Sequence, residues 1–212
     1  MNNETLKNKI NEKVQNVLEY ICNGATLILV LLIIVYKNER IILYTFEVFY
    51  VVLIGLESII ENRKISMKYT LWSVVFFTIC LLSSVYAVNQ EVAVKQTFNV
   101  LKVLLIGNSL VLYVNKDKSK INFIFYSIII SSIYLTILLV MKTPYYYLGT
   151  VRLGENIGLN ENDLGYKMAI SSIISIYLGN KNKKWYYYLL SVVFSLVAFF
   201  SGSRKAFLMI VI

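Results

Sequence analysis

Two arginines of this chain stand beside glycines, in VRLGENIGLNEND (151–163) and in SGSRKA (201–206). A guanidinium group is planar and always charged, and it can bind two phosphate oxygens at once. The glycines leave room for a bulky anion next to the backbone. Arg152 and Arg204 are therefore candidates for binding phosphate. The alternative is that both lie in solvated connections, the first of which ends in an Asn helix cap.

The residues around the two arginines could complete such a site. Asparagine amides offer neutral donors and acceptors of the kind that sugar hydroxyls need. If a helix begins near Arg204, its N–H groups and dipole favour an anion there. The candidate binding residues beside the arginines are Gly154, Asn160, Asn162, Gly202, Ser203 and Lys205.

Ionisable residues also occur inside apolar runs, where charge is costly and often functional. Lys102 and Glu47 each lie five or six residues into such a run. Lys167 follows Asp163 by four positions, so the two share a helix face. Lys102 and Lys167 join the candidate binding residues. The alternative is that these lysines extend to the interface, or that Lys102 and Glu47 form a buried pair. Glu57, near the end of its run, is expected to reach for water.

The composition defines the elements that position these residues. Hydrophobic residues make up 58% of the 212 residues and charged residues 16%, whereas soluble domains have roughly 45–50% and about 25%. The apolar residues gather in runs of nearly membrane length, which excludes an ordinary soluble domain. We expect an all-α, polytopic bundle of transmembrane helices.

Seven apolar runs are long enough to cross a bilayer: 17–36, 41–60, 69–88, 97–114, 122–141, 160–179 and 185–201. An eighth run begins near Ala206 and is cut off at Ile212, too short to cross. Residues 1–16 are polar with apolar positions at helical spacing, which indicates a separate amphipathic segment on the membrane surface. The transmembrane bundle is expected over 17–212, with a Gly-rich loop at about 142–160.

The basic residues predict the orientation. Twelve of the 21 lie in one alternating set of connections and seven in the other, and the remaining two are Lys102 and Lys167. Every segment of the first set holds three: Lys7, Lys9 and Lys13; Arg63, Lys64 and Lys68; Lys116, Lys118 and Lys120; Lys181, Lys183 and Lys184. The positive-inside rule makes this set cytoplasmic. The N-terminus is then cytoplasmic, and both arginine motifs face outward.

Several classes of chemistry are excluded. The net charge of +9 does not indicate a nucleic-acid partner, because the basic residues form short clusters between apolar runs. Cys22 and Cys80 both lie in apolar runs, so neither is expected in a disulfide. The chain has no histidine, which rules out His-ligated metals and histidine triads. We expect no metal and no cofactor.

The same motifs carry a resemblance to a known family. An Arg-Leu-Gly, an Asn-containing helix start, a pair of spans and then Gly-Ser-Arg-Lys-Ala at the next span resemble the O-antigen ligase/polymerase family. The motifs cover about 150–212, and the topology covers the whole chain. Glu161 stands where the family often has proline before the asparagine. These enzymes join lipid-linked oligosaccharides at the outer face of the bacterial cytoplasmic membrane.

The resemblance implies glycan transfer from a polyprenyl-diphosphate carrier, with Arg152 and Arg204 holding the diphosphate. Membrane lipids and other glycan-assembly membrane proteins would be its partners. Family members continue into further spans and a large outer loop, so the chain is expected to be an N-terminal part that is inactive alone. Two alternatives remain: a transporter or flippase for an anionic lipid or solute, and an inactive remnant.

Overall fold

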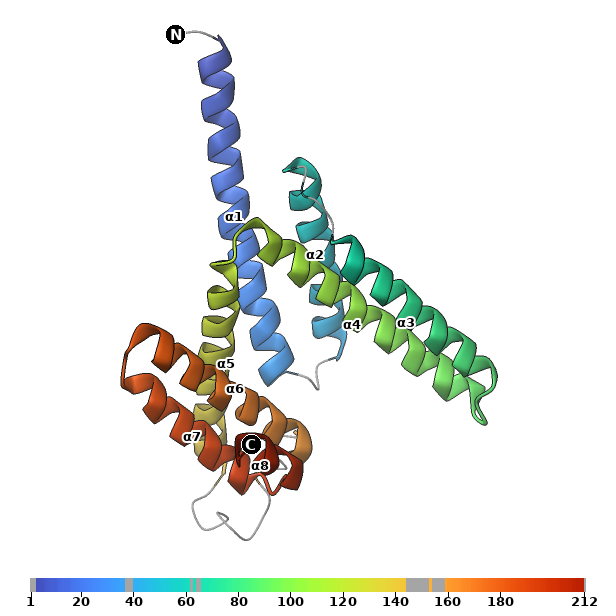
Figure 1. Ribbon diagram of the computed structural model, residues 1–212, viewed down its shortest axis with the longest axis vertical. Helices are drawn as coiled ribbons and strands as arrows, with labels where there is room; N and C mark the ends of the chain where they lie inside the picture. Colours follow the sequence, from blue (N-terminus) through green and yellow to red (C-terminus); the bar gives the residue numbers. More distant parts are fainter. Residues whose placement is uncertain are drawn as a thin grey trace. The chain divides into compact units, whose positions relative to one another are not determined.

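The computed structural model describes residues 3–36, 40–61, 63, 66–143, 153 and 159–211 (Figure 1). All regular structure in these ranges is α-helical, as expected. The helices are α1 (Asn3–Val35), α2 (Arg40–Ile60), α3 (Met67–Val85), α4 (Gln90–Lys116), α5 (Lys120–Lys142), α6 (Glu161–Asn182), α7 (Tyr186–Phe200) and α8 (Arg204–Val211).

Five helices in the described part of the chain are long and apolar enough to cross a membrane: α1 from Lys13, α2, α3, α4 and α5. The chain is therefore a multi-pass helical membrane protein. Helices also form where the sixth, seventh and eighth runs were expected. Helix α7 is apolar but has only 15 residues, and α6 is not among the five. Membrane crossing by α6 and α7 stays a prediction.

Two helices extend beyond their expected bounds. Helix α4 begins at Gln90 rather than near residue 97, because Asn89 caps it: the Asn89 side chain accepts a hydrogen bond from the Val92 N–H at 3.2 Å. Such a cap satisfies an N–H that has no partner within the helix. Helix α1 runs unbroken from Asn3 to Val35. The polar residues 3–16 thus belong to the same helix as the first apolar run.

The chain forms two compact units. Unit 1 comprises Met1–Ala25 and Tyr44–Asn122, and unit 2 comprises Thr26–Leu43 and Phe123–Ile212. In unit 1, α3 and α4 pack together as an antiparallel hairpin (Figure 1). In unit 2, α6 packs antiparallel against α7 and also contacts α8. The apolar core of unit 2 is formed by side chains of α1, α5, α6 and α7, with Leu153 and Leu159.

Small residues let α8 approach α6 closely. A Cβ atom added at Gly165 of α6 would lie 2.7 Å from the Ser203 Cβ and 2.9 Å from the Ala206 Cβ. These distances are shorter than a carbon–carbon contact allows. Helix association in a membrane often relies on small residues, which permit backbones to meet. The absence of a side chain at Gly165 therefore allows the start of α8 to pack closely against the start of α6.

Candidate functional site

A tight corner joins α7 to α8. Helix α7 ends at Phe200, and Gly202 adopts φ = 74°, the left-handed conformation that glycine accepts most readily. Ser203 is buried and caps α8: its Oγ accepts a hydrogen bond from the Ala206 N–H at 3.4 Å. The helix therefore begins at Arg204, where the sequence motif predicted an N-terminus.

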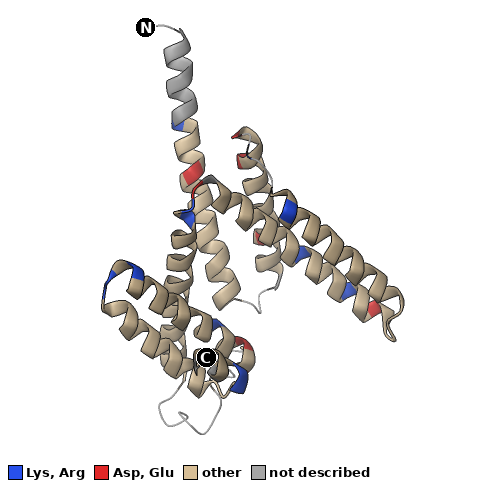
Figure 2. Cartoon of the chain, in the orientation of Figure 1, with Lys and Arg blue, Asp and Glu red and all other residues tan. Residues whose placement is uncertain are grey.

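The two basic residues of this corner, Arg204 and Lys205, are exposed. Arg204 borders an open hollow of about 490 Å³ that is also lined by Phe199, Gly202, Ser203 and Leu208. Figure 2 shows basic residues at the start of α8 and at the α6–α7 turn, and α7 between them carries no charged residue. The corner thus combines a cation, a helix N-terminus and open space, which together suit an anion.

The start of α6 lies beside this corner. Asn160 caps α6 by accepting a hydrogen bond from the Asn162 N–H at 2.9 Å. Asn160 and Asn162 lie five and three residues before Gly165, and Gly165 packs closely against Ser203. The structure thereby brings together two segments that the sequence named separately. The Asn160 carbonyl side chain already serves as a cap, while Asn162 is exposed.

Other predicted residues of the loop lie outside the described part of the chain. These are Arg152 and Gly154. Leu153 is described: it is buried, and its N–H donates to the Phe200 carbonyl at 3.3 Å. Leu153 is therefore anchored at the end of α7.

Lys167 has structural partners. Its Nζ lies 3.0 Å from the Asp163 Oδ2 and donates a hydrogen bond to the Ile34 carbonyl at 2.9 Å. Ile34 lies in the last turn of α1, where unpaired carbonyls and the helix dipole favour a cation. The expected pairing with Asp163 is present. The Lys167 side chain is only 12% exposed, so its ammonium group lies mostly within this contact.

Lys102 and Glu47 form a pair in unit 1. The Lys102 Nζ lies 3.3 Å from the Glu47 Oε2 and 3.9 Å from the centre of the Tyr44 ring. The Glu47 side chain is buried and that of Lys102 is 30% exposed. The ammonium group is thus shared between a carboxylate and an aromatic face. From the sequence alone, this pairing of Lys102 with Glu47 is the alternative to a binding role for Lys102.

A buried cluster of charges in unit 1 was not predicted. Glu57 does not reach for water: it is fully buried, and its Oε1 lies 2.5 Å from the Arg63 Nη2. Arg63 also contacts the Glu61 Oε2 at 2.8 Å and donates to the Leu112 carbonyl at 3.2 Å. The expectation that Glu57 reaches for water was wrong, because Arg63 folds back onto α2 and pairs with it. In the sequence, Arg63 served only to predict the orientation of the chain. The Glu57–Glu61–Arg63 spacing was the available signal.

A second buried cation lies in the same unit. The Lys120 Nζ is 3.3 Å from the Glu19 Oε1 and 4.6 Å from the centre of the Tyr113 ring. The buried Tyr113 hydroxyl donates to the Asn23 Oδ1 at 2.6 Å. These contacts join α1 to the end of α4 and the start of α5. Because each polar group has a partner, the cluster holds these helix ends together.

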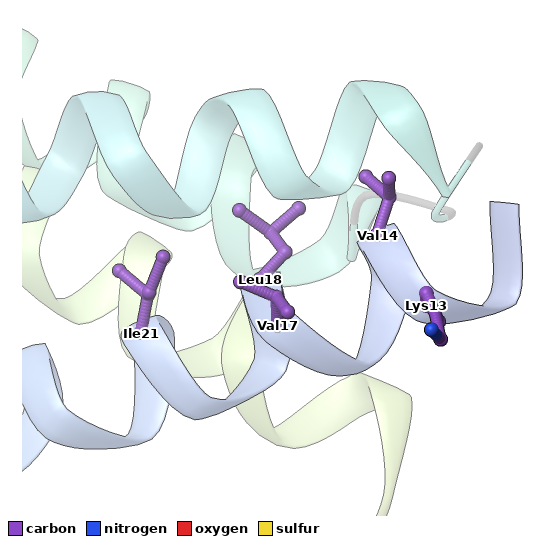
Figure 3. Close-up of a pocket in the computed structure, with 5 residues that line it drawn as sticks. All are labelled: Lys13, Val14, Val17, Leu18 and Ile21. Carbon is purple, nitrogen blue, oxygen red and sulfur yellow. The ribbon is translucent and has the colours of Figure 1, made fainter. Parts of the chain in front are cut away.

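Helix α1 also carries a shallow apolar hollow of about 290 Å³ (Figure 3). Val14, Leu18 and Ile21 point to one side of the helix, and Lys13 lies at the end of the hollow that is nearer the N-terminus. The lining is apolar apart from Lys13. Its exposed valine and isoleucine side chains are typical of a helix surface that meets lipid.

Comparison with known proteins adds no relative. No family model matches the chain, and neither a curated protein nor a solved structure matches it. The class defined by the helices is a multi-pass membrane protein. Any function therefore rests on the residues and their arrangement.

Proposed function

We propose that this chain belongs to a membrane glycan polymerase or ligase of the O-antigen type. It would act at the outer face of a bacterial cytoplasmic membrane, with its N-terminus in the cytoplasm. Seven spans and the start of an eighth would place the arginine motifs outside. The substrate would be an oligosaccharide on a polyprenyl diphosphate.

The observation that carries the proposal is the corner where α7, α8 and the start of α6 meet. Arg204 and Lys205 are exposed at the N-terminus of α8, beside an open hollow. Gly202 and Ser203 add little bulk there. The corner thus offers positive charge and the N-terminus of α8 to a phosphate, and Asn162 lies on the neighbouring helix start.

The chemistry requires an anionic leaving group. An acceptor hydroxyl attacks the anomeric carbon and gives its proton to water, the bond from that carbon to the phosphate oxygen breaks, and the diphosphate leaves with its electron pair. Arg204 would bind two of its oxygens and stabilise the growing charge. Arg152 is proposed to bind the other phosphate. Neither a metal nor a nucleotide sugar takes part.

Substitution of the arginines tests this role. Arg204→Lys and Arg152→Lys keep the charge but lose the two-pronged contact. Charged hydrogen bonds contribute roughly 1.5–3 kcal/mol each, so each variant should lose about 90% or more of transfer activity. Lys205→Ala should be milder. The measurement is glycan length in cells that carry each variant in the native gene at matched protein levels. If Arg204→Lys is silent, the arginine only extends to the interface and the proposed site is wrong.

The orientation has its own test. Cysteine is introduced at Lys118 or at Gly154 after Cys22 and Cys80 are replaced by alanine. An impermeant thiol reagent should label Gly154→Cys and spare Lys118→Cys in intact cells. The reverse pattern would place the arginine motifs inside and remove the proposal.

A transporter or flippase for an anionic lipid or solute is the second candidate. The observation that favours it is the set of ion pairs in unit 1, such as Glu47 with Lys102. Charged residues within membrane helices often mark transport pathways. Lys102→Met should then abolish substrate movement across vesicles while leaving glycan length unchanged. The glycan enzyme predicts the opposite ranking, with Arg204→Lys the more damaging.

A further inference from the structure

An apolar groove of about 530 Å³ opens between the end of α5 and the end of α7 in unit 2. Its walls are Leu139, Val140 and Met141 on one side and Leu196, Val197 and Phe200 on the other, and Leu153 also contributes. The volume falls within the range of roughly 300–1,000 Å³ that is usual for ligand sites.

One end of the groove is polar. Lys142, the last residue of α5, is exposed and lines it together with Thr143. The Thr143 Oγ1 is buried and has no hydrogen-bond partner among the described residues. A buried hydroxyl normally finds a partner. An acceptor bound in the groove would supply one, and Lys142 favours an acceptor that carries negative charge.

We propose that this groove binds one acyl chain of an anionic phospholipid, whose phosphate contacts Lys142 and the Thr143 hydroxyl. Helix α5 is one of the helices long and apolar enough to span a membrane, so its lipid-facing surface meets hydrocarbon. Lys142 and Thr143 stand at the end of that span, at the depth of the headgroups. The apolar walls of the groove suit the acyl chain of the lipid, and its polar end suits the phosphate.

This lipid site goes beyond the proposed glycan transfer. The groove shares no lining residue with the site proposed for the diphosphate. Phe200 lines the groove, whereas Phe199 lines the hollow at Arg204. A free phosphate would leave the apolar walls uncovered. A peptide segment would bring backbone groups that the walls cannot satisfy.

Photolabelling tests the proposal. The purified full chain is placed in lipid nanodiscs with phosphatidylglycerol that carries a diazirine in its acyl chain, and labelled peptides are mapped by mass spectrometry. Labels should be several-fold denser on residues 136–143 and 193–200 than on α3. Helix α3 is an exposed apolar span, so it reports ordinary bilayer contact.

Two pairs of variants sharpen the assay. Val193→Trp fills the groove and should remove the excess labelling, whereas Val192→Trp, on the exposed neighbour that does not line it, should not. Lys142→Gln should lower the preference for phosphatidylglycerol over phosphatidylcholine roughly five-fold, the factor that corresponds to about 1 kcal/mol per cation near an anionic headgroup. Lys118→Gln, exposed in another connection, is the matched control.

Three results would overturn the assignment. Labelling of the groove no denser than that of α3 would leave only ordinary bilayer contact. Equal labelling by phosphatidylcholine would remove the phosphate contact. Displacement by an equimolar polyprenyl phosphate, but not by unlabelled phosphatidylglycerol, would assign the groove to a carrier lipid. Circular dichroism of each variant confirms that it is folded.

Discussion

The two units of this chain differ in their buried charges. Unit 1 buries one or both partners of three ion pairs: Glu57 with Arg63, Lys120 with Glu19, and Glu47 with Lys102. Both units bury hydroxyls, but in the described part of unit 2 the buried polar side chains are all serine or threonine. The Ser132 and Ser171 Oγ atoms are 2.7 Å apart across α5 and α6, and the Ser172 Oγ contacts those of Ser191 at 2.8 Å and Ser195 at 2.9 Å across α6 and α7.

The difference matters for how each unit holds its helices together. A buried charge is costly without its partner, so each ion pair makes two elements depend on each other. A serine costs little when buried because it can also bond to its own helix: the Ser171 Oγ donates to the Lys167 carbonyl at 2.8 Å. Serine is also small, so α6 and α7 can pack closely. Loss of one partner should therefore harm unit 1 more than unit 2.

The largest effect is expected from breaking the buried pair of unit 1. Arg63→Met leaves Glu57 without its cation, and the loss of one partner of a buried pair costs about 3–5 kcal/mol. The free energy of unfolding in detergent micelles, followed by circular dichroism during denaturant titration, measures it. The double variant Glu57→Gln with Arg63→Met should recover most of the loss. Equal loss in both would show that the pair itself contributes nothing.

The next effect concerns the close contact of unit 2. Gly165→Ala forces a methyl group against Ser203 and Ala206, and overpacking costs about 1–3 kcal/mol. Gly55→Ala in α2 is the control, because a Cβ there meets nothing within 4 Å. It should be neutral or stabilising by up to about 1 kcal/mol. The same titration compares the two, and equal effects would contradict the close packing of α8 on α6.

A smaller loss is expected from the hydroxyl contacts. Ser172→Ala removes the side chain that contacts both Ser191 and Ser195. Hydrogen bonds between membrane helices average about 0.6 kcal/mol and reach about 1.7, so the loss should lie in that range. Ser83→Ala, at an exposed position of α3, should change the free energy of unfolding little. A loss as large as that of Arg63→Met would erase the contrast between the units.

The smallest effect lies in the connection between α4 and α5, outside the spans. The Asp117 carboxylate accepts hydrogen bonds from the Ser119 hydroxyl and, at 2.8 Å, from the Ser119 backbone N–H. These two bonds lower the pKa of Asp117. Because this pKa is lower in the folded chain, the folded state is stabilised at pH values above the ordinary pKa of Asp. The stabilisation is lost as the pH falls through the lowered pKa of the folded chain. Ser119→Ala should raise the Asp117 pKa toward the ordinary value. Carbon-13 NMR titration of the Asp117 carboxyl measures it, and an unchanged pKa would exclude the hydroxyl as the cause.

Local patterns in the sequence predicted much of the helical structure. Runs of apolar residues marked the five long helices, and the Gly-Ser-Arg motif marked the start of α8 at Arg204. The spacing of Asp163 and Lys167 predicted their pairing, since residues four apart share a helix face. The start of α4 was missed because a helix can extend through polar residues once an Asn caps it. These features depend on neighbours in the sequence, which is why the sequence contains them.

Contacts between distant residues were decided only by the tertiary structure. Arg63 reaches the Leu112 carbonyl, and Gly165 meets Ser203. The groove between α5 and α7 likewise needs side chains from both helices. By itself the sequence determined a helical membrane chain and the positions of its charges. The fold decided which charges are buried in pairs and which remain exposed, because an ion pair or a cavity depends on how separate helices pack, and apolar periodicity fixes a helix without fixing its neighbours.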